Sequence, residues 1–189
     1  NPRPTRSGRL ARNGYIRALM TNSDAFLVTA RRVISTEAEA LSLLADALDV
    51  EFARAVELLL SVKGRVIISG MGKSGHIGRK IAATFASTGT PAQFVHPAEA
   101  SHGDLGMISS NDVVIMLSNS GETTELADII AYTRRFAIPL IGVASRAEST
   151  LLKASDVALL LPQAPEACGT GIVPTTSTTM TLALGDALA

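Results

Sequence analysis

The segment RVIISGMGKSGHIGRK, residues 65–80, decides the fold, because it passes from an apolar stretch through a glycine-rich loop into a helical pattern. The segment MLSNSGETTEL, residues 116–126, repeats this order with a serine-rich loop. A strand followed by a helix, repeated along a chain, is typical of a parallel sheet that helices cover on both faces. The two segments together therefore predict an α/β fold.

Short apolar runs alternate with helical runs along the rest of the chain. This pattern predicts a three-layer αβα sandwich around a five-stranded parallel sheet, which is a Rossmann-like arrangement. The expected strands are 65–69, 92–95, 113–117, 140–144 and 157–161. The expected helices between them are 75–87, 123–136 and 149–154.

Two further helices are expected before the sheet. Apolar residues recur at helical spacing over residues 23–48. Asp49 is a suitable N-cap for a second helix, which Gly64 would end. The last helical pattern stops at Ala189 without a C-terminal signal, so we expect the chain to be truncated relative to a longer protein.

The composition is that of one globular domain, residues 23–189, behind a basic tail, residues 1–22. Basic and acidic residues number 17 each, and this balance argues against a protein that binds nucleic acid by neutralising phosphates. No apolar run reaches the roughly 18 residues that a membrane-spanning helix needs. The single cysteine, Cys168, excludes an internal disulfide and fits a reducing cytoplasm.

The glycine-rich loop admits several interpretations. Gly70, Gly72 and Gly75 satisfy the dinucleotide fingerprint G-x-G-x-x-G, but the acidic residue expected about 20 positions later is missing from the end of the second strand, QFVHP. A Walker loop is excluded because its first glycine would fall on Ile67. A site for a smaller phosphate and a plain strand-to-helix turn with a solvated Lys73 both remain open.

The serine-rich loop favours a phosphate. Ser118, Ser120 and Thr123 supply three hydroxyl groups around Asn119 and Gly121, and the first N–H groups of the next helix would face the same space. The alternative is a Ser/Thr helix cap, which explains one hydroxyl group better than three. Both loops follow strands of a parallel sheet, so we expect them at its carboxyl edge, where open α/β sheets bind ligands.

Several segments together resemble the sugar-isomerase (SIS) domain of D-arabinose 5-phosphate isomerases. They are GMGKSGHIGRK, HGDLG, LSNSGET and EACGTGIVPTTSTTMTLALGDALA, within a match from about residue 66 to residue 189. The resemblance implies the SIS fold and a cytoplasmic aldose–ketose isomerase. Its substrates would be D-ribulose 5-phosphate and D-arabinose 5-phosphate, for the synthesis of Kdo and lipopolysaccharide. The alternative is a non-catalytic SIS module that binds a sugar phosphate as a regulatory ligand.

An isomerase of this kind needs a base that carries a proton between C1 and C2 through an enediol, and groups that stabilise the developing oxyanion. The resemblance implies that Lys73, Glu125 and Glu166 are catalytic. Lys73 suits an electrostatic role, and we favour Glu166 over Glu125 as the base. Without the resemblance, a solvated surface charge is the favoured interpretation of either glutamate. The substrate-binding residues that the resemblance implies are Gly72, Ser74, Ser118, Asn119, Ser120, Gly121, Glu122, Thr123 and His102.

The resemblance also implies that no cofactor is required and that the protein is a homo-oligomer, a tetramer built as a dimer of dimers. His102 matches a family histidine that can take part in metal binding, so an adventitious or inhibitory zinc ion is expected there at most. His76 fits a surface position and a ligand role equally well, and His96 has a structural interpretation. The family carries a further histidine beyond the GDALA helix, and many members continue into a pair of CBS domains. This chain stops before both, so we expect weak turnover.

Overall fold

The computed structural model describes the backbone of residues 6–189 and the side chains of residues 23–189; residues 1–5 of the predicted basic tail lie outside the described residues. Five parallel strands form one sheet in the order β2–β1–β3–β4–β5. The strands are β1 (Val66–Gly70), β2 (Ala92–Phe94), β3 (Val113–Leu117), β4 (Leu140–Ala144) and β5 (Val157–Leu160). The predicted strand bounds agree with these to within one residue at every end.

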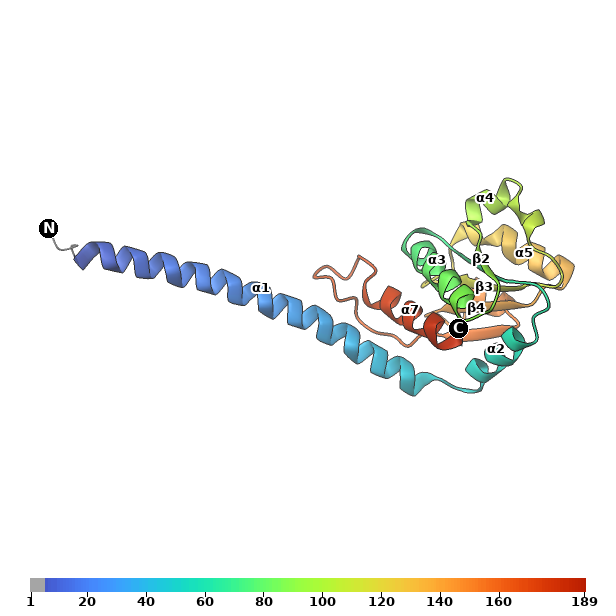
Figure 1. The fold of residues 1–189 in the computed structure, drawn as a ribbon, viewed down its shortest axis with the longest axis horizontal. Coiled ribbons are helices and arrows are strands. Elements are labelled where there is room, and N and C mark those ends of the chain that lie inside the picture. Colours follow the sequence, from blue (N-terminus) through green and yellow to red (C-terminus); the bar gives the residue numbers. More distant parts are fainter. Residues whose placement is uncertain (1–5) are drawn as a thin grey trace.

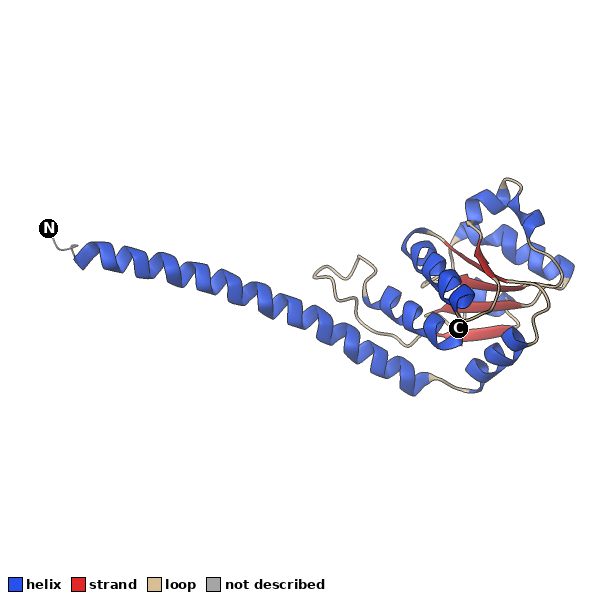
Figure 2. Ribbon diagram, viewed as in Figure 1, coloured by secondary structure: helices blue, strands red, loops and turns tan. Residues whose placement is uncertain are grey.

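Helices cover both faces of the sheet, as Figure 2 shows. Alternate residues of each strand point to opposite faces, so that Ile68 and Ile115 pack under one layer while Ile67 and Val114 pack under the other. The first layer holds α1 (Arg6–Ala47), α2 (Val50–Leu60), α3 (Gly72–Ser87) and α7 (Thr176–Leu188). The second layer holds α4 (Pro97–Ser101), α5 (Ala127–Phe136) and α6 (Thr150–Ala154). The predicted αβα sandwich is confirmed.

Helix α1 is 42 residues long, and its N-terminal half projects away from the sandwich (Figure 1). We expected this helix to begin at Ser23, whereas it begins at Arg6. The difference arises because Gly8 and Gly14 each cost a helix only about 1 kcal/mol relative to alanine and do not end it. Within the described residues, neither α1 nor another helix combines the length and the apolar character needed to cross a membrane.

Three local features differ from the predictions. Helix α2 ends at Leu60 rather than at Gly64, whose N–H instead bonds to the loop before β3 at 2.7 Å. The helix predicted over 123–136 is divided into a 3₁₀ turn, η2 (Thr124–Leu126), and α5. Helix α4 and the 3₁₀ turn η1 (Asp104–Met107) were not predicted, because four or five residues are too few to show a helical period.

Candidate active site

The glycine-rich and serine-rich loops lie side by side at the carboxyl edge of the sheet. Strands β1 and β3 are neighbours, and Gly70 at the end of β1 pairs in register with Leu117 at the end of β3. The strand order reverses direction at this pair, since β2 lies beyond β1 and β4 lies beyond β3. Such a switch point is where open α/β sheets bind ligands. The prediction that both loops share one edge is therefore confirmed.

The glycine-rich loop turns directly from β1 into α3. A Cβ atom on Gly75 would lie 2.6 Å from the carbonyl oxygen of Gly70, so this close approach needs glycine. The first turn of α3 has no side-chain cap among the described residues, and its N–H groups can therefore face an anion. Lys73 is exposed in the same turn and Ser74 is half-buried. A cationic side chain beside uncapped N–H groups favours a negatively charged ligand.

The serine-rich loop is closed by its own hydroxyl groups. The hydroxyl oxygens of Ser118 and Thr123 are 2.8 Å apart, and the Gly121 N–H donates to the Ser118 hydroxyl at 3.0 Å. Gly121 has a φ of +69°, and a Cβ atom there would lie 2.2 Å from the Ser149 hydroxyl oxygen. Two of the three hydroxyl groups predicted to bind phosphate therefore bond to each other and shape the loop.

Glu122 fixes this loop to helix α6. Its carboxylate accepts hydrogen bonds from the Thr150 N–H at 2.8 Å and from the Thr150 hydroxyl at 2.7 Å. These bonds, the hydroxyl bond first, lower the pKa of the Glu122 carboxyl. The carboxylate thus has a structural partner, and the substrate-binding role implied for Glu122 stays a prediction. The neighbouring Ser120 is half-buried, and its hydroxyl accepts from the Glu122 N–H at 3.2 Å.

Hydrogen bonds continue from this loop to the loops that follow β4 and β5. The Asn119 carbonyl accepts from the Ser145 N–H at 2.9 Å and from the Ser145 hydroxyl at 2.7 Å. The Ser145 carbonyl in turn accepts from the side-chain amide of Gln163, three residues before Glu166. The sequence did not single out Ser145 or Gln163. The signal that could have found them is their position just after the ends of β4 and β5.

Glu166 lies in the loop between β5 and α7, and the N-terminus of α7 holds its carboxylate. Oε2 accepts from the Thr175 N–H at 2.7 Å, from the Thr175 hydroxyl at 3.1 Å and from the Ser177 N–H at 3.3 Å. Oε1 accepts no hydrogen bond from the described residues. The half-buried carboxylate is therefore oriented through Oε2, and Oε1 keeps its capacity to accept a further hydrogen bond.

Two opposing effects act on the pKa of Glu166. Burial raises this pKa, but hydrogen bonds from Ser177 and Thr175 together outweigh burial and lower it below the ordinary value. The Ser177 hydroxyl is buried without a hydrogen-bond partner among the described residues, so we assign the effect of Ser177 to its N–H. The carboxylate is thus ionised at neutral pH, as a base must be before it takes a proton.

Lys73 and Glu125, the other residues predicted to be catalytic, are both exposed. Glu125 lies in η2, and its carboxylate accepts from the Thr124 hydroxyl at 3.0 Å. Among the described residues, no backbone N–H holds this carboxylate as α7 holds Glu166. Lys73, Glu125 and Glu166 follow β1, β3 and β5 respectively. The structure therefore places all three beyond the carboxyl ends of strands, with Lys73 in the first turn of α3, Glu125 in η2 and Glu166 in a loop.

The three histidines have different surroundings. The His96 Nδ1 accepts from the Ala98 N–H at 3.3 Å and caps α4, in agreement with a structural interpretation. His76 and His102 are exposed. In the part of the chain that the structure describes, no three His, Cys, Asp or Glu side chains are grouped to hold a metal ion. Zinc binding at His102 therefore stays a prediction.

The SIS domain family model matches residues 59–189, most of the sandwich described above. The chain belongs to the SIS domain family. Arabinose 5-phosphate isomerase KdsD of Pseudomonas aeruginosa is 53% identical to this SIS domain over 164 residues, which are 87% of this chain and 50% of the relative. KdsD of Escherichia coli K12 is 51% identical with the same coverage. The chain thus spans about half the length of these curated relatives.

A solved structure shares the arrangement of this SIS domain. It is a protein of Escherichia coli CFT073 in complex with arabinose 5-phosphate, and its TM-score to this chain is 0.84 at 41% sequence identity. The match covers 88% of each chain. The SIS fold predicted from the sequence is therefore confirmed.

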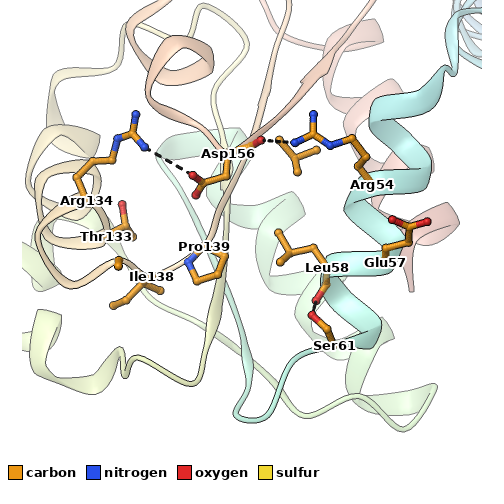
Figure 3. A pocket seen from close by; sticks show the side chains of 11 residues that line it. Arg54, Glu57, Leu58, Ser61, Thr133, Arg134, Ile138, Pro139 and Asp156 are labelled. Atoms are coloured by element: carbon orange, nitrogen blue, oxygen red, sulfur yellow. Dashed lines mark hydrogen bonds and ion pairs between the residues drawn. The ribbon is translucent and has the colours of Figure 1, made fainter.

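A cavity of about 630 Å³ lies at the opposite edge of the SIS domain, between α2 and α5 and beside the amino ends of β4 and β5 (Figure 3). The Arg54 guanidinium donates to the carbonyl oxygen of Asp156 at 3.2 Å, and Arg134 lies 3.6 Å from the Asp156 carboxylate. None of the predicted site residues lines this cavity. Because ligands of such sheets bind at the carboxyl ends of the strands, we place the candidate active site at that edge.

Proposed function

We propose that this SIS domain interconverts D-ribulose 5-phosphate and D-arabinose 5-phosphate through an enediol. The observation that carries the proposal is the Glu166 carboxylate, which α7 holds through Oε2 and leaves open at Oε1. Two supports come from relatives: curated isomerases at 53% and 51% identity are named for arabinose 5-phosphate, and a similar structure contains this sugar phosphate.

In this proposal Glu166 moves the proton. Oε1 takes the proton from C2 of the open-chain aldose, and the resulting enediolate is protonated at C1 to give the ketose. The hydroxyl proton at O2 leaves while O1 gains one, so the sugar is rearranged without external electrons and no cofactor is required. Lys73 would stabilise the negative charge of the enediolate, and the exposed Glu125 is the alternative base.

The phosphate group would anchor the sugar at the switch point. The uncapped first turn of α3, the exposed Lys73 and the adjoining serine-rich loop offer donors for a dianion there. Binding energy from the phosphate then orients the carbons that react, at some distance from the anchor. The order of the loops along the edge agrees with a separation between the phosphate anchor and the carbons that react. The loop with Glu166 follows β5, whereas the glycine-rich and serine-rich loops, which we call the phosphate loops, follow β1 and β3.

The proposal extends to assembly and location. Helix α1 carries large apolar side chains on its exposed surface, with Phe26 72% and Ile34 68% exposed. Contiguous exposed apolar surface marks a protein interface, and a second copy of the chain is the partner we propose. A tetramer built as a dimer of dimers would cover this helix. We place the enzyme in the cytoplasm, where its product would enter Kdo and lipopolysaccharide synthesis.

The test is incubation of the chain with D-ribulose 5-phosphate, with the products identified by NMR. We expect D-arabinose 5-phosphate to form, and in deuterated water we expect deuterium at C2 of that product. Binding of the sugar phosphate without interconversion or exchange would favour the alternative, a non-catalytic SIS module. Binding of NADH in preference to pentose phosphates would favour the dinucleotide interpretation of the glycine-rich loop.

A further inference from the structure

Helix α1 reaches the loop that carries Glu166. The Arg32 guanidinium donates to the carbonyl oxygen of Ala167 at 3.1 Å, although the two residues are 135 positions apart. Five residues further along α1, the Glu37 carboxylate accepts from the Thr179 hydroxyl of α7 at 3.1 Å. The same helix therefore holds both structures that surround Glu166, its loop and the helix that binds its carboxylate.

Ala167 is fixed on both sides of its backbone. It is fully buried, and its N–H donates to the Thr175 hydroxyl at 2.9 Å and to the Thr176 hydroxyl at 3.0 Å, while its carbonyl accepts from Arg32. The Thr175 hydroxyl that accepts this N–H donates its own proton to Glu166 Oε2. The backbone of Ala167 thus links a hydrogen bond from the surface of α1 to the hydrogen bonds that end on the carboxylate.

We propose that Arg32 is a positioning residue of the active site, which fixes the Glu166 carboxylate by anchoring the Ala167 carbonyl to α1. The inference rests on the proposed function, since it takes Glu166 as the base. A guanidinium forms a stronger hydrogen bond to a carbonyl than a neutral donor does, which suits it to hold a loop from outside. Arg32 itself is exposed, so its removal leaves no cavity in the core.

The kinetic test compares Arg32→Ala with Arg31→Ala, a change at the adjacent exposed arginine, which makes no hydrogen bond to the described residues of the loop. For Arg32→Ala we expect kcat to fall by about 10- to 100-fold, since a small displacement of a catalytic group has an effect of this size. KM should change by less than about twofold, because the phosphate loops are untouched. Arg32→Lys should recover part of kcat, and Arg31→Ala should leave it unchanged. Equal kcat values for Arg32→Ala and Arg31→Ala would overturn the inference.

Amide hydrogen exchange gives a measure that does not depend on activity. In Arg32→Ala, the amides of Ala167, Thr175 and Ser177 should exchange about tenfold faster than in the unchanged chain, while the amides of β1 and β3 keep their protection. If the unchanged chain does not isomerise the sugar, the proposed function fails. Hydrogen exchange then still tests whether Arg32 anchors the loop that carries Glu166. Unchanged exchange at the three amides would overturn it. Equally faster exchange in the strands would also overturn it, because Arg32 would then act on global stability.

Discussion

Thr175 binds Glu166 twice, through its N–H at 2.7 Å and its hydroxyl at 3.1 Å, and both bonds end on Oε2. The arrangement separates two roles within one carboxylate. Oε2 holds the group in place, and Oε1 is the oxygen that would take the proton in the proposed reaction. The loop that carries Glu166 does not fix the carboxylate by itself, because the hydrogen-bond donors come from the N-terminus of α7.

Replacement of Glu166 by glutamine tests the base. Glu166→Gln keeps the size of the side chain and removes its basicity, so turnover should fall by about 10²- to 10⁴-fold. Affinity for the sugar phosphate should change much less, since the phosphate loops are intact. Steady-state kinetics and deuterium incorporation measure the two effects. Glu125→Gln is the matched control, and a larger loss there would assign the base to Glu125.

The stability of the fold should depend on the ionisation of Glu166. Folding lowers its pKa below the ordinary 4.5, so the ionised carboxylate stabilises the fold above that pH, and this contribution is lost as the pH falls through the folded-state pKa. Glu166→Gln should therefore be less stable than the unchanged chain at neutral pH, and the difference should shrink below pH 4.5. Urea unfolding at neutral and acidic pH measures the difference. An equal difference in the free energy of unfolding at both pH values would contradict the prediction.

The hydroxyl groups of the serine-rich loop should contribute both to sugar-phosphate binding and to the stability of the fold. Alanine at Ser118, Ser120 and Thr123 together should weaken sugar-phosphate binding, by roughly 1.5–3 kcal/mol for each charge-assisted bond lost. Ser118→Ala alone should also lower the free energy of unfolding by about 1–3 kcal/mol, because Ser118 is 5% exposed and accepts the Gly121 N–H. Calorimetric titration and urea unfolding check the two parts. Undiminished affinity in the triple variant would place the phosphate elsewhere.

A side chain at Gly121 should destabilise the serine-rich loop. Its φ of +69° disfavours other residues, and a Cβ atom would lie 2.2 Å from the Ser149 hydroxyl oxygen. Gly121→Ala should cost about 1–3 kcal/mol of stability and displace the loop. Gly106→Ala is the matched control, since a Cβ atom there meets nothing within 4 Å. Equal melting temperatures for the two variants would contradict the prediction, because the loop would then accommodate a Cβ atom at Gly121 without loss of stability.

The sheet was predictable because each strand is a short apolar run between turn signals, a local property of the sequence. The start of α1 was not predictable, because residues 1–22 were interpreted as a basic tail, whereas the two glycines within the helix cost it little. Short elements such as α4 could not be predicted for a different reason, because five residues are too few to show a helical period.

Parts of the candidate site could also be predicted, because Lys73 and the serine-rich loop directly follow strand ends and the remaining residues came from a family resemblance. The partners of these residues could not. The Arg32 bond to Ala167 spans 135 positions and the Glu122 bond to Thr150 spans 28, and no local pattern encodes which distant donor a loop will meet. Such contacts depend on how the layers pack.

Hydrogen bonds join the serine-rich loop to α6. Glu122 accepts from the first turn of α6, and the Leu151 N–H donates to the Gly121 carbonyl at 3.0 Å. Opening the loop would break these bonds and release the first turn of a helix only five residues long. A ligand that holds the loop closed would therefore slow opening of α6 as well. Hydrogen exchange at the backbone amides of α6 would therefore report whether the proposed phosphate site is occupied, although the ligand does not contact them.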